Sequence, residues 1–183
     1  PIAHVGAGAN ADGFVEIAVR RMPEGVCSGY LNALEPGDEI RAFIRPNPGF
    51  RAAKGRAPVI LVAAGCGVGP AIGLLRHLRP GRAAELYFGI RHPRSDFLYR
   101  RETDAMLADG RLSRRIMAFS RVGEPSRVQD RLRENAGELA RQIQAGGQVL
   151  ICGGAAMARD VGRAFDEILQ PCGLTVAELK ADG

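Results

Sequence analysis

Hydrophobic and polar residues alternate with a period of two in the first part of the chain, up to about residue 57. Residues 14–20 show this alternation, and residues 38–46 repeat it with Ile40, Ala42 and Ile44 on one face. Such alternation is typical of strands that bury one face. The turn sequences EPGDE and RPNPG lie beside the second strand. We therefore predict half-buried strands in this region.

From Pro58 onward, short apolar runs alternate with longer segments of helical periodicity. Alternating strands and helices predict a parallel sheet that is covered by helices on both faces. The change of pattern places a domain boundary within residues 50–58. The strands are expected at residues 59–64, 84–90, 113–119 and 148–152, and the helices at residues 70–79, 97–108, 128–145 and 155–170.

Composition is that of a globular protein of 183 residues, because 46% of the residues are hydrophobic. No apolar stretch reaches the roughly 18–20 residues that a membrane span needs, and the first residues lack the pattern of a signal peptide. We therefore expect a cytoplasmic protein with no membrane segment in this chain. The four cysteines form no CxxC pair, and the three histidines share no ligand spacing, so we expect no metal site.

The formal net charge is +5, from 25 Lys and Arg against 20 Asp and Glu. A basic protein is a candidate for nucleic-acid binding. However, Trp is absent, aromatic residues make up 5%, and only two lysines occur, which leaves little surface for base stacking. The arginines are spread along the chain. We expect no nucleic-acid partner, and we expect a few arginines to bind a small anionic ligand.

Three glycines and a proline follow the first predicted parallel strand, in the sequence VILVAAGCGVGP. Gly65, Gly67 and Gly69 allow backbone N–H groups to approach a phosphate that a Cβ would keep away. Pro70 suits the first turn of the next helix. In a doubly wound sheet this loop faces the ligand at the carboxyl ends of the strands. The loop therefore predicts a phosphate-binding site.

The next two strands indicate which phosphate ligand is bound. An NAD site usually has an acidic residue after the second strand, but here no carboxylate occurs before Asp96. The third strand ends in Ser120 and Arg121, and Arg127 follows shortly after. A hydroxyl beside a guanidinium is suited to bind a 2′-phosphate. NADP is therefore favoured over NAD.

Five motifs occur together in order: GCGVGP, YFGIRHPRSDFLYRRE, AFSR, VQDRLREN and VLICGGAAMARDVGRAFDEIL. In order and spacing they resemble the ferredoxin-NADP reductase superfamily. The similarity is greatest to the diflavin branch, which includes the sulfite reductase flavoprotein, the NADPH-dependent cytochrome reductases and the reductase half of nitric oxide synthase. The resemblance implies a doubly wound parallel five-stranded sheet in residues 58–183, preceded by a partial antiparallel β-barrel in residues 1–57 that belongs to an FAD-binding domain.

The resemblance also implies roles for individual residues. Arg91 and Asp96 match a motif on the pyrophosphate side, Ser120 and Arg121 match the pair that binds the 2′-phosphate, and Cys152 matches a cysteine placed near the nicotinamide during hydride transfer. The family more often has threonine where this chain has Cys66. Other implied NADP(H) contacts are Gly65, Cys66, Gly67, Val68, Gly69, Pro70, Arg127, Gly153, Met157 and Asp160. Implied FAD contacts are Gly25, Val26, Cys27 and Ser28.

Two departures from the family limit this interpretation. Pro125 and Arg127 stand where the family has a lysine and a tyrosine, so the resemblance implies no adenine contact from a tyrosine at this position. The flavin-contact motif that precedes the match and the tail that follows it in the family have no counterpart in this sequence. We therefore expect a piece of a longer reductase that binds NADPH, binds FAD weakly or not at all, and has negligible turnover alone.

Three functional hypotheses remain at this stage. The first is the NADP(H)-binding part of a diflavin electron-transfer reductase, with an FMN-carrying flavodoxin-like domain or an acceptor protein as its partner. The second is a single-flavin ferredoxin or flavodoxin reductase. The third is a nucleotide-binding or basic interaction module with no redox role, whose binding would collapse with salt.

Overall fold

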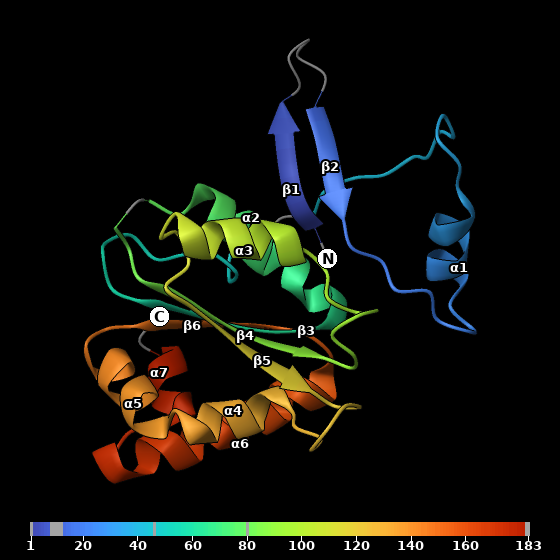
Figure 1. Ribbon diagram of the computed structural model, residues 1–183. Helices are drawn as coiled ribbons and strands as arrows, with labels where there is room; N and C mark the ends of the chain where they lie inside the picture. The colour runs from blue at the N-terminus through green and yellow to red at the C-terminus, as the bar shows by residue number, and fades with distance from the viewer. Residues whose placement is uncertain (1, 8–12, 46, 80, 182–183) are drawn as a thin grey trace.

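The core of the molecule is a parallel β-sheet. A computed structural model of the chain describes residues 2–7, 13–45, 47–79 and 81–181. Within them, four strands form this sheet in the order β5-β4-β3-β6 (Figure 1). The predicted mixed α/β class is confirmed, but the expected number of five strands is wrong, since the chain after β6 is helical. The strands are β3 (Val59–Ala64), β4 (Ala84–Ile90), β5 (Arg114–Phe119) and β6 (Gln148–Cys152).

Helices cover both faces of the sheet, as the alternating pattern predicted (Figure 1). In β3, Leu61 and Ala63 belong to the hydrophobic core under α2 and α3, whereas Ile60 and Val62 belong to the core under α4, α5 and α6. A strand that is buried on both faces is apolar throughout, which explains the continuous run VILVAA. The helices are α2 (Val68–His77), α3 (Arg100–Ala108), α4 (Val128–Glu134), α5 (Ala136–Gln144), α6 (Ala155–Leu169) and the short α7 (Val176–Ala181).

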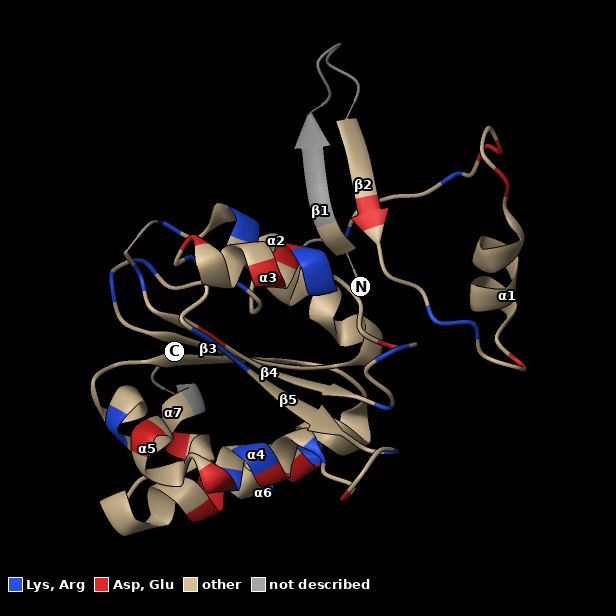
Figure 2. Ribbon diagram, in the orientation of Figure 1, with Lys and Arg blue, Asp and Glu red and all other residues tan. Residues whose placement is uncertain are grey.

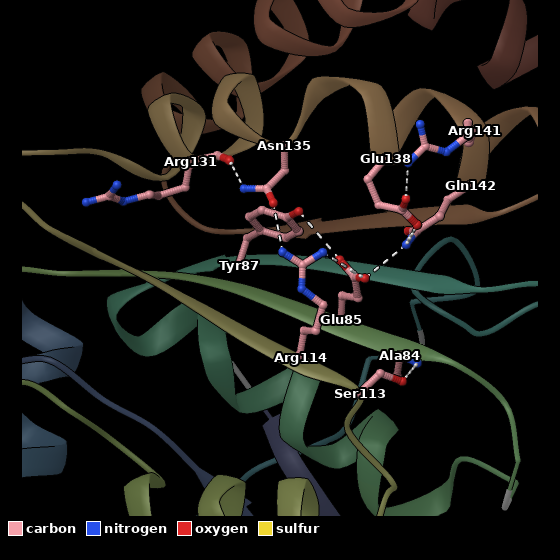
Figure 3. A network of polar contacts seen from close by, with 10 residues as sticks. All are labelled: Ala84, Glu85, Tyr87, Ser113, Arg114, Arg131, Asn135, Glu138, Arg141 and Gln142. Atoms are coloured by element: carbon pink, nitrogen blue, oxygen red, sulfur yellow. Dashed lines mark hydrogen bonds and ion pairs between the residues drawn. The ribbon is translucent and has the colours of Figure 1, made fainter.

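The helix predicted over residues 128–145 is interrupted at Asn135. This residue separates α4 from α5 with φ −107° and ψ 19°. Its side chain donates to the Arg131 carbonyl over 2.8 Å and accepts a 2.7 Å hydrogen bond from Arg114 (Figure 3). Arg114 also approaches the buried carboxylate of Glu85 at 3.5 Å. A contact with the neighbouring strand thus holds the break, and this contact leaves no mark in the helical periodicity.

The predicted helix over residues 97–108 begins later, at Arg100. Among the described residues, Tyr99 is the one residue other than glycine with a positive φ, at 57°. A left-handed residue cannot continue a helix in the amino direction, so Tyr99 is the N-cap of α3. Its carbonyl accepts hydrogen bonds from both the backbone and the hydroxyl of Thr103.

The N-terminal region contains a hairpin of β1 (Ile2–Ala7) and β2 (Gly13–Ile17), which pair antiparallel. This hairpin lies on α2, where a Cβ at Gly73 would overlap with the Ala3 carbonyl. The strand predicted over residues 38–46 is wrong for residues 38–45, and residue 46 lies outside the described residues. Ile40 and Ile44 are 45% and 49% exposed, so the face that the alternation predicted to be buried stays exposed in this chain.

A helix that the pattern did not predict, α1 (Val26–Ala33), follows the hairpin. None of its described side chains is buried, and it lies apart from the parallel sheet (Figure 1). A 3₁₀ turn, Gln170–Cys172, follows α6. No helix in the described part of the chain is long and apolar enough to cross a lipid bilayer.

Candidate functional site: a cleft at the carboxyl ends of the strands

A cleft of about 1080 Å³ crosses the carboxyl edge of the parallel sheet. The residues after β3, β4, β5 and β6 line it, together with the end of β2 and the start of α4 and α6. Ligands bind at this edge in doubly wound sheets, because the loops there connect to helix N-termini. The cleft is therefore the candidate site.

The glycine loop forms the floor of the cleft as a 3₁₀ turn, Gly65–Gly67, between β3 and α2. Gly65 has φ +54°, a conformation that L side chains rarely adopt. Gly67 is buried, and a Cβ there would overlap with the Cys152 carbonyl at the end of β6. The turn thus brings bare backbone to the cleft at the start of a helix, which is an arrangement suited to phosphate oxygens.

The ends of β4 and β5 stay paired beyond the strands themselves. The backbone N–H of Ser120 donates to the Ile90 carbonyl, and that of Arg121 donates to the Arg91 carbonyl, over 3.0 and 3.1 Å. These contacts bring Ser120 beside Arg91, and both residues line the cleft. The exposed guanidinium of Arg91 donates to Asp96 over 2.9 Å. A hydroxyl and a guanidinium are therefore available at one edge of the cleft.

The hydrogen bond from Arg91 holds the pKa of Asp96 below its usual value of 3.8. A carboxyl whose pKa is lowered by folding stabilises the folded state above its unfolded pKa, and this contribution is lost as the pH falls through the lower folded pKa. The pair is partly exposed, so we expect Asp96→Asn to cost no more than about 1 kcal/mol at pH 7. Denaturation by urea at pH 7 and below pH 3.8 measures the difference between wild type and variant, which should shrink at the lower pH.

The loop between β5 and α4 returns to the sheet at Ser126. Its N–H donates to the Phe119 carbonyl over 2.9 Å, and its hydroxyl accepts from Arg131 over 3.1 Å. Arg127 is the N-cap of α4, and its backbone N–H donates to Asp130 over 2.7 Å. The Arg127 side chain is exposed, and both Ser126 and Arg127 line the cleft. This end of the cleft therefore offers a second group of donors.

Cys152 lies at the end of β6, half-buried, on the opposite side of the glycine turn. Burial raises the pKa of the Cys152 thiol, so the side chain is neutral at pH 7. Gly153, Met157 and Asp160 line the cleft beside it, and the Met157 side chain packs closely on Gly153. The Cys152 thiol and the Met157 thioether give this end a neutral, polarizable surface, and Asp160, which pairs with Arg163 at 3.6 Å, adds a carboxylate beside it.

One wall of the cleft was not anticipated from the sequence. Residues 17–20, at and after the end of β2, line it together with Leu98 and Tyr99. The period-two pattern predicted a strand over residues 14–20, but it gave no indication that its end reaches the carboxyl edge of another sheet. The helix predicted over residues 97–108 includes Leu98 and Tyr99, whereas both residues precede α3.

Several residues that the sequence assigned to the site lie elsewhere. Val68 and Gly69 are buried inside the first turn of α2, and Pro70 faces a second, smaller cavity beside Ala3 and Phe50. Arg121 is exposed and does not line the cleft, although its backbone pairs with Arg91. The four residues 25–28 lie at the start of α1, away from the cleft (Figure 1). Their assignment to a second cofactor stays a prediction.

Among residues 2–7, 13–45, 47–79 and 81–181, no group of three or more His, Cys, Asp and Glu side chains is placed to hold a metal ion. The donors that face the cleft are arginines, serines and backbone N–H groups, which bind anions.

A doubly wound sheet with a glycine turn under a cleft at its carboxyl edge defines a dinucleotide-binding domain. Residues 61–163, more than half of the chain, match the oxidoreductase NAD-binding domain family, and the chain belongs to this family. This match confirms the predicted resemblance to the ferredoxin-NADP reductase superfamily.

Relatives with known names support the same grouping. The chain is 36% identical over 157 residues to the sulfite reductase (NADPH) flavoprotein alpha-component of Mannheimia succiniciproducens, with 81% of this chain and 26% of the relative covered. It is 37% identical over 173 residues to the protein of the same name from Citrobacter koseri, with 89% and 28% covered. It is 36% identical over 164 residues to the nitric oxide synthase of Bombyx mori, with 81% and 14% covered. The chain thus spans about a quarter of the length of the sulfite reductase relatives.

Proposed function

We propose that the chain is the NADP(H)-binding part of an NADPH-dependent flavoprotein oxidoreductase of the diflavin type. One observation carries the proposal: the glycine turn, the Cys152 end of β6 and the donors after β4 and β5 all line the same cleft. The names of the sulfite reductase relatives, which include both NADPH and a flavoprotein, support this choice of ligand.

The cleft divides into ends of different chemistry. We assign the 2′-phosphate to Ser120 and Arg127, with Arg121 joining them from the adjacent exposed loop. The pyrophosphate is assigned to Arg91 and to the backbone of the 65–67 turn, in which Gly65 and Gly67 carry no Cβ. The nicotinamide is then left beside Cys152, whose neutral thiol places no charge against the ring.

The longer protein would carry out hydride transfer from NADPH to FAD, which is chemistry that the two cofactors supply. This chain binds and orients the nucleotide. Residues 58–183 form the NADP(H) domain in this proposal, and residues 1–57 belong to the FAD-binding domain, with Gly25, Val26, Cys27 and Ser28 as flavin contacts. FAD binding by this chain alone would be weak. An FMN-carrying flavodoxin-like domain or an acceptor protein would receive the electrons, in the cytoplasm.

Calorimetric titration with 2′,5′-ADP and 5′-AMP tests the proposal. We expect 2′,5′-ADP to bind and 5′-AMP to bind far more weakly, because only the former carries the 2′-phosphate. Arg121→Ala should weaken 2′,5′-ADP by the roughly 1.5–3 kcal/mol of a hydrogen bond between charged groups. Arg159→Ala is the control, since it removes an exposed arginine of α6 that neither lines the cleft nor belongs to the loop after β5.

The alternatives predict different titrations. Equal affinity for both nucleotides, lost steeply as salt is added, would contradict the NADP assignment and favour the non-redox binding module. An unchanged affinity in Arg121→Ala would contradict the role of Arg121. A single-flavin reductase predicts the same titration, and it is distinguished by the lack of a flavodoxin-like domain in the longer protein.

A further inference from the structure

One arginine connects three elements near the unanticipated wall of the cleft. Arg76, on α2, donates to Glu16 on β2 over 2.8 Å. It also donates to both oxygens of Glu102 on α3, over 2.6 and 2.8 Å. Figure 2 shows basic and acidic segments together where β2 approaches these two helices. The guanidinium therefore links β2 to both α2 and α3.

Tyr99 belongs to the same group of contacts. The Arg76 guanidinium lies over the Tyr99 ring at 5.8 Å from its centroid. Burial, together with a hydrogen bond to Glu16, raises the pKa of the Tyr99 phenol. Tyr99 also holds a left-handed backbone conformation, which persists only where surrounding contacts enforce it. Arg76 over the ring and Glu16 at the hydroxyl thus hold the Tyr99 side chain in place.

Two of the three partners of Arg76, Glu16 and Tyr99, lead directly to the cleft. Glu16 is followed by residues 17–20, which line one wall, and Tyr99 lines the same cleft with Leu98. Arg76 does not line the cleft itself. Its side chain is 21% exposed and those of Glu16 and Glu102 are 34% and 31% exposed, so the charges are partly shielded from water. Without the guanidinium, two carboxylates would face each other across the gap between β2 and α3.

We propose that Arg76 is a positioning residue that fixes the wall formed by residues 17–20 and Tyr99. Through this wall it determines how well the nicotinamide end of the dinucleotide fits the cleft. This inference rests on the proposed function, which assigns the 2′-phosphate of the adenosine half to Ser120 and Arg127 and the nicotinamide to the Cys152 end of the cleft. The wall at Ile17 and Tyr99 presents apolar and aromatic surface, which suits a ring. Arg76 therefore affects the binding of the nicotinamide half of the ligand and leaves the binding of the adenosine half unchanged.

The test compares two nucleotides, of which only one contains the nicotinamide half. Wild type and Arg76→Gln are titrated by calorimetry with NADP⁺, which has both halves, and with 2′,5′-ADP, which lacks the nicotinamide half. We expect Arg76→Gln to weaken NADP⁺ about tenfold, because small misplacements of a binding surface have large effects, while 2′,5′-ADP changes less than about twofold. A purely structural role would not separate the two ligands.

Two further variants separate positioning from stability. Glu16→Ala removes the link from Arg76 to β2 while the Arg76–Glu102 pair stays, so it should weaken NADP⁺ in the same selective way. Arg133→Gln is the matched control, because Arg133 also makes a two-point contact with one carboxylate, Glu167, between α4 and α6. It does not line the cleft, so neither nucleotide should respond.

The outcomes distinguish this inference from the proposed function. If wild type binds neither nucleotide, the proposed function fails and the inference fails with it. If wild type binds both and the Arg76 and Glu16 variants bind NADP⁺ as wild type does, the inference alone is overturned. Parallel weakening of both nucleotides by Arg76→Gln would also overturn it, since that result indicates a general loss of structure.

Discussion

Replacing Gly67 by alanine should abolish nucleotide binding and lower the stability of the chain. The added Cβ would overlap with the Cys152 carbonyl oxygen and lie 2.7 Å from its carbonyl carbon. Both are main-chain atoms at the end of β6, so no flexible side chain can move aside. Either β6 or the 65–67 turn must shift, at a cost of about 1–3 kcal/mol for an overpacked site.

The same shift explains the expected loss of binding. The turn that Gly67 ends is the part of the chain that offers backbone N–H groups to the cleft. A displacement of this turn moves those donors and the neighbouring end of β6 together. Thermal denaturation measures the loss of stability, and titration with 2′,5′-ADP measures the loss of affinity.

Gly154→Ala provides a control inside the same cleft. Gly154 has φ −68° and ψ 152°, an ordinary extended conformation, and a Cβ there would meet nothing within 4 Å. Because glycine is a better N-cap than alanine, Gly154→Ala should cost roughly 0.5–1 kcal/mol of stability at the start of α6, with no overlap to displace the turn or β6. If Gly67→Ala and Gly154→Ala had the same stability and the same affinity for 2′,5′-ADP, the close approach of the turn to β6 would not be needed for binding.

The parallel strands could be predicted from the sequence because burial determines their composition directly. A strand covered on both faces must be apolar throughout, as VILVAA is in β3, and glycines must follow where the chain turns sharply. The strand ends then indicate which residues share an edge. This reasoning placed Gly65 and Ser120 at one edge of the sheet, the family resemblance added Arg91 and Cys152, and all four line the same cleft.

The rest depends on contacts between segments that are distant in sequence. Nothing in the helical periodicity of residues 128–145 marks Asn135, whose break is stabilised by Arg114 from β5. The alternation at Ile40 and Ile44 predicts a strand only where a neighbouring surface buries one face, and in this chain both residues stay half-exposed. The cleft wall at residues 17–20 was missed for the same reason, since only the packing of the hairpin on α2 brings it there.

The predicted boundary segment, residues 50–58, leads to the second large effect. Arg82 is buried, with 7% exposure, and its guanidinium donates to the carbonyls of Ala53 and Ala57 over 2.6 and 2.7 Å. The Gln148 side chain accepts from the Ala53 N–H and donates to the Arg51 carbonyl. Side chains from the parallel sheet region thus hold this segment, although its sequence resembles that of a linker.

Arg82→Met should therefore destabilise the chain by roughly 2–4 kcal/mol, because two hydrogen bonds to a charged donor are lost and two carbonyls lose their partners. Methionine keeps the length of the side chain, so the loss of packing is small. Arg79→Met is the control, since Arg79 is exposed in the same loop. Urea denaturation measures the difference in stability, and trypsin digestion shows whether cleavage after Arg51, Lys54 and Arg56 becomes faster.

These two measurements give different information about the boundary. If stability falls and trypsin cleaves the segment faster, Arg82 holds residues 53–57 onto the sheet, and any movement between the regions before and after them must first break these hydrogen bonds. If stability falls while cleavage is unchanged, Gln148 is sufficient to hold the segment. If Arg82→Met and Arg79→Met are equally stable, the buried guanidinium contributes nothing, and residues 50–58 connect the two regions as an unrestrained linker would.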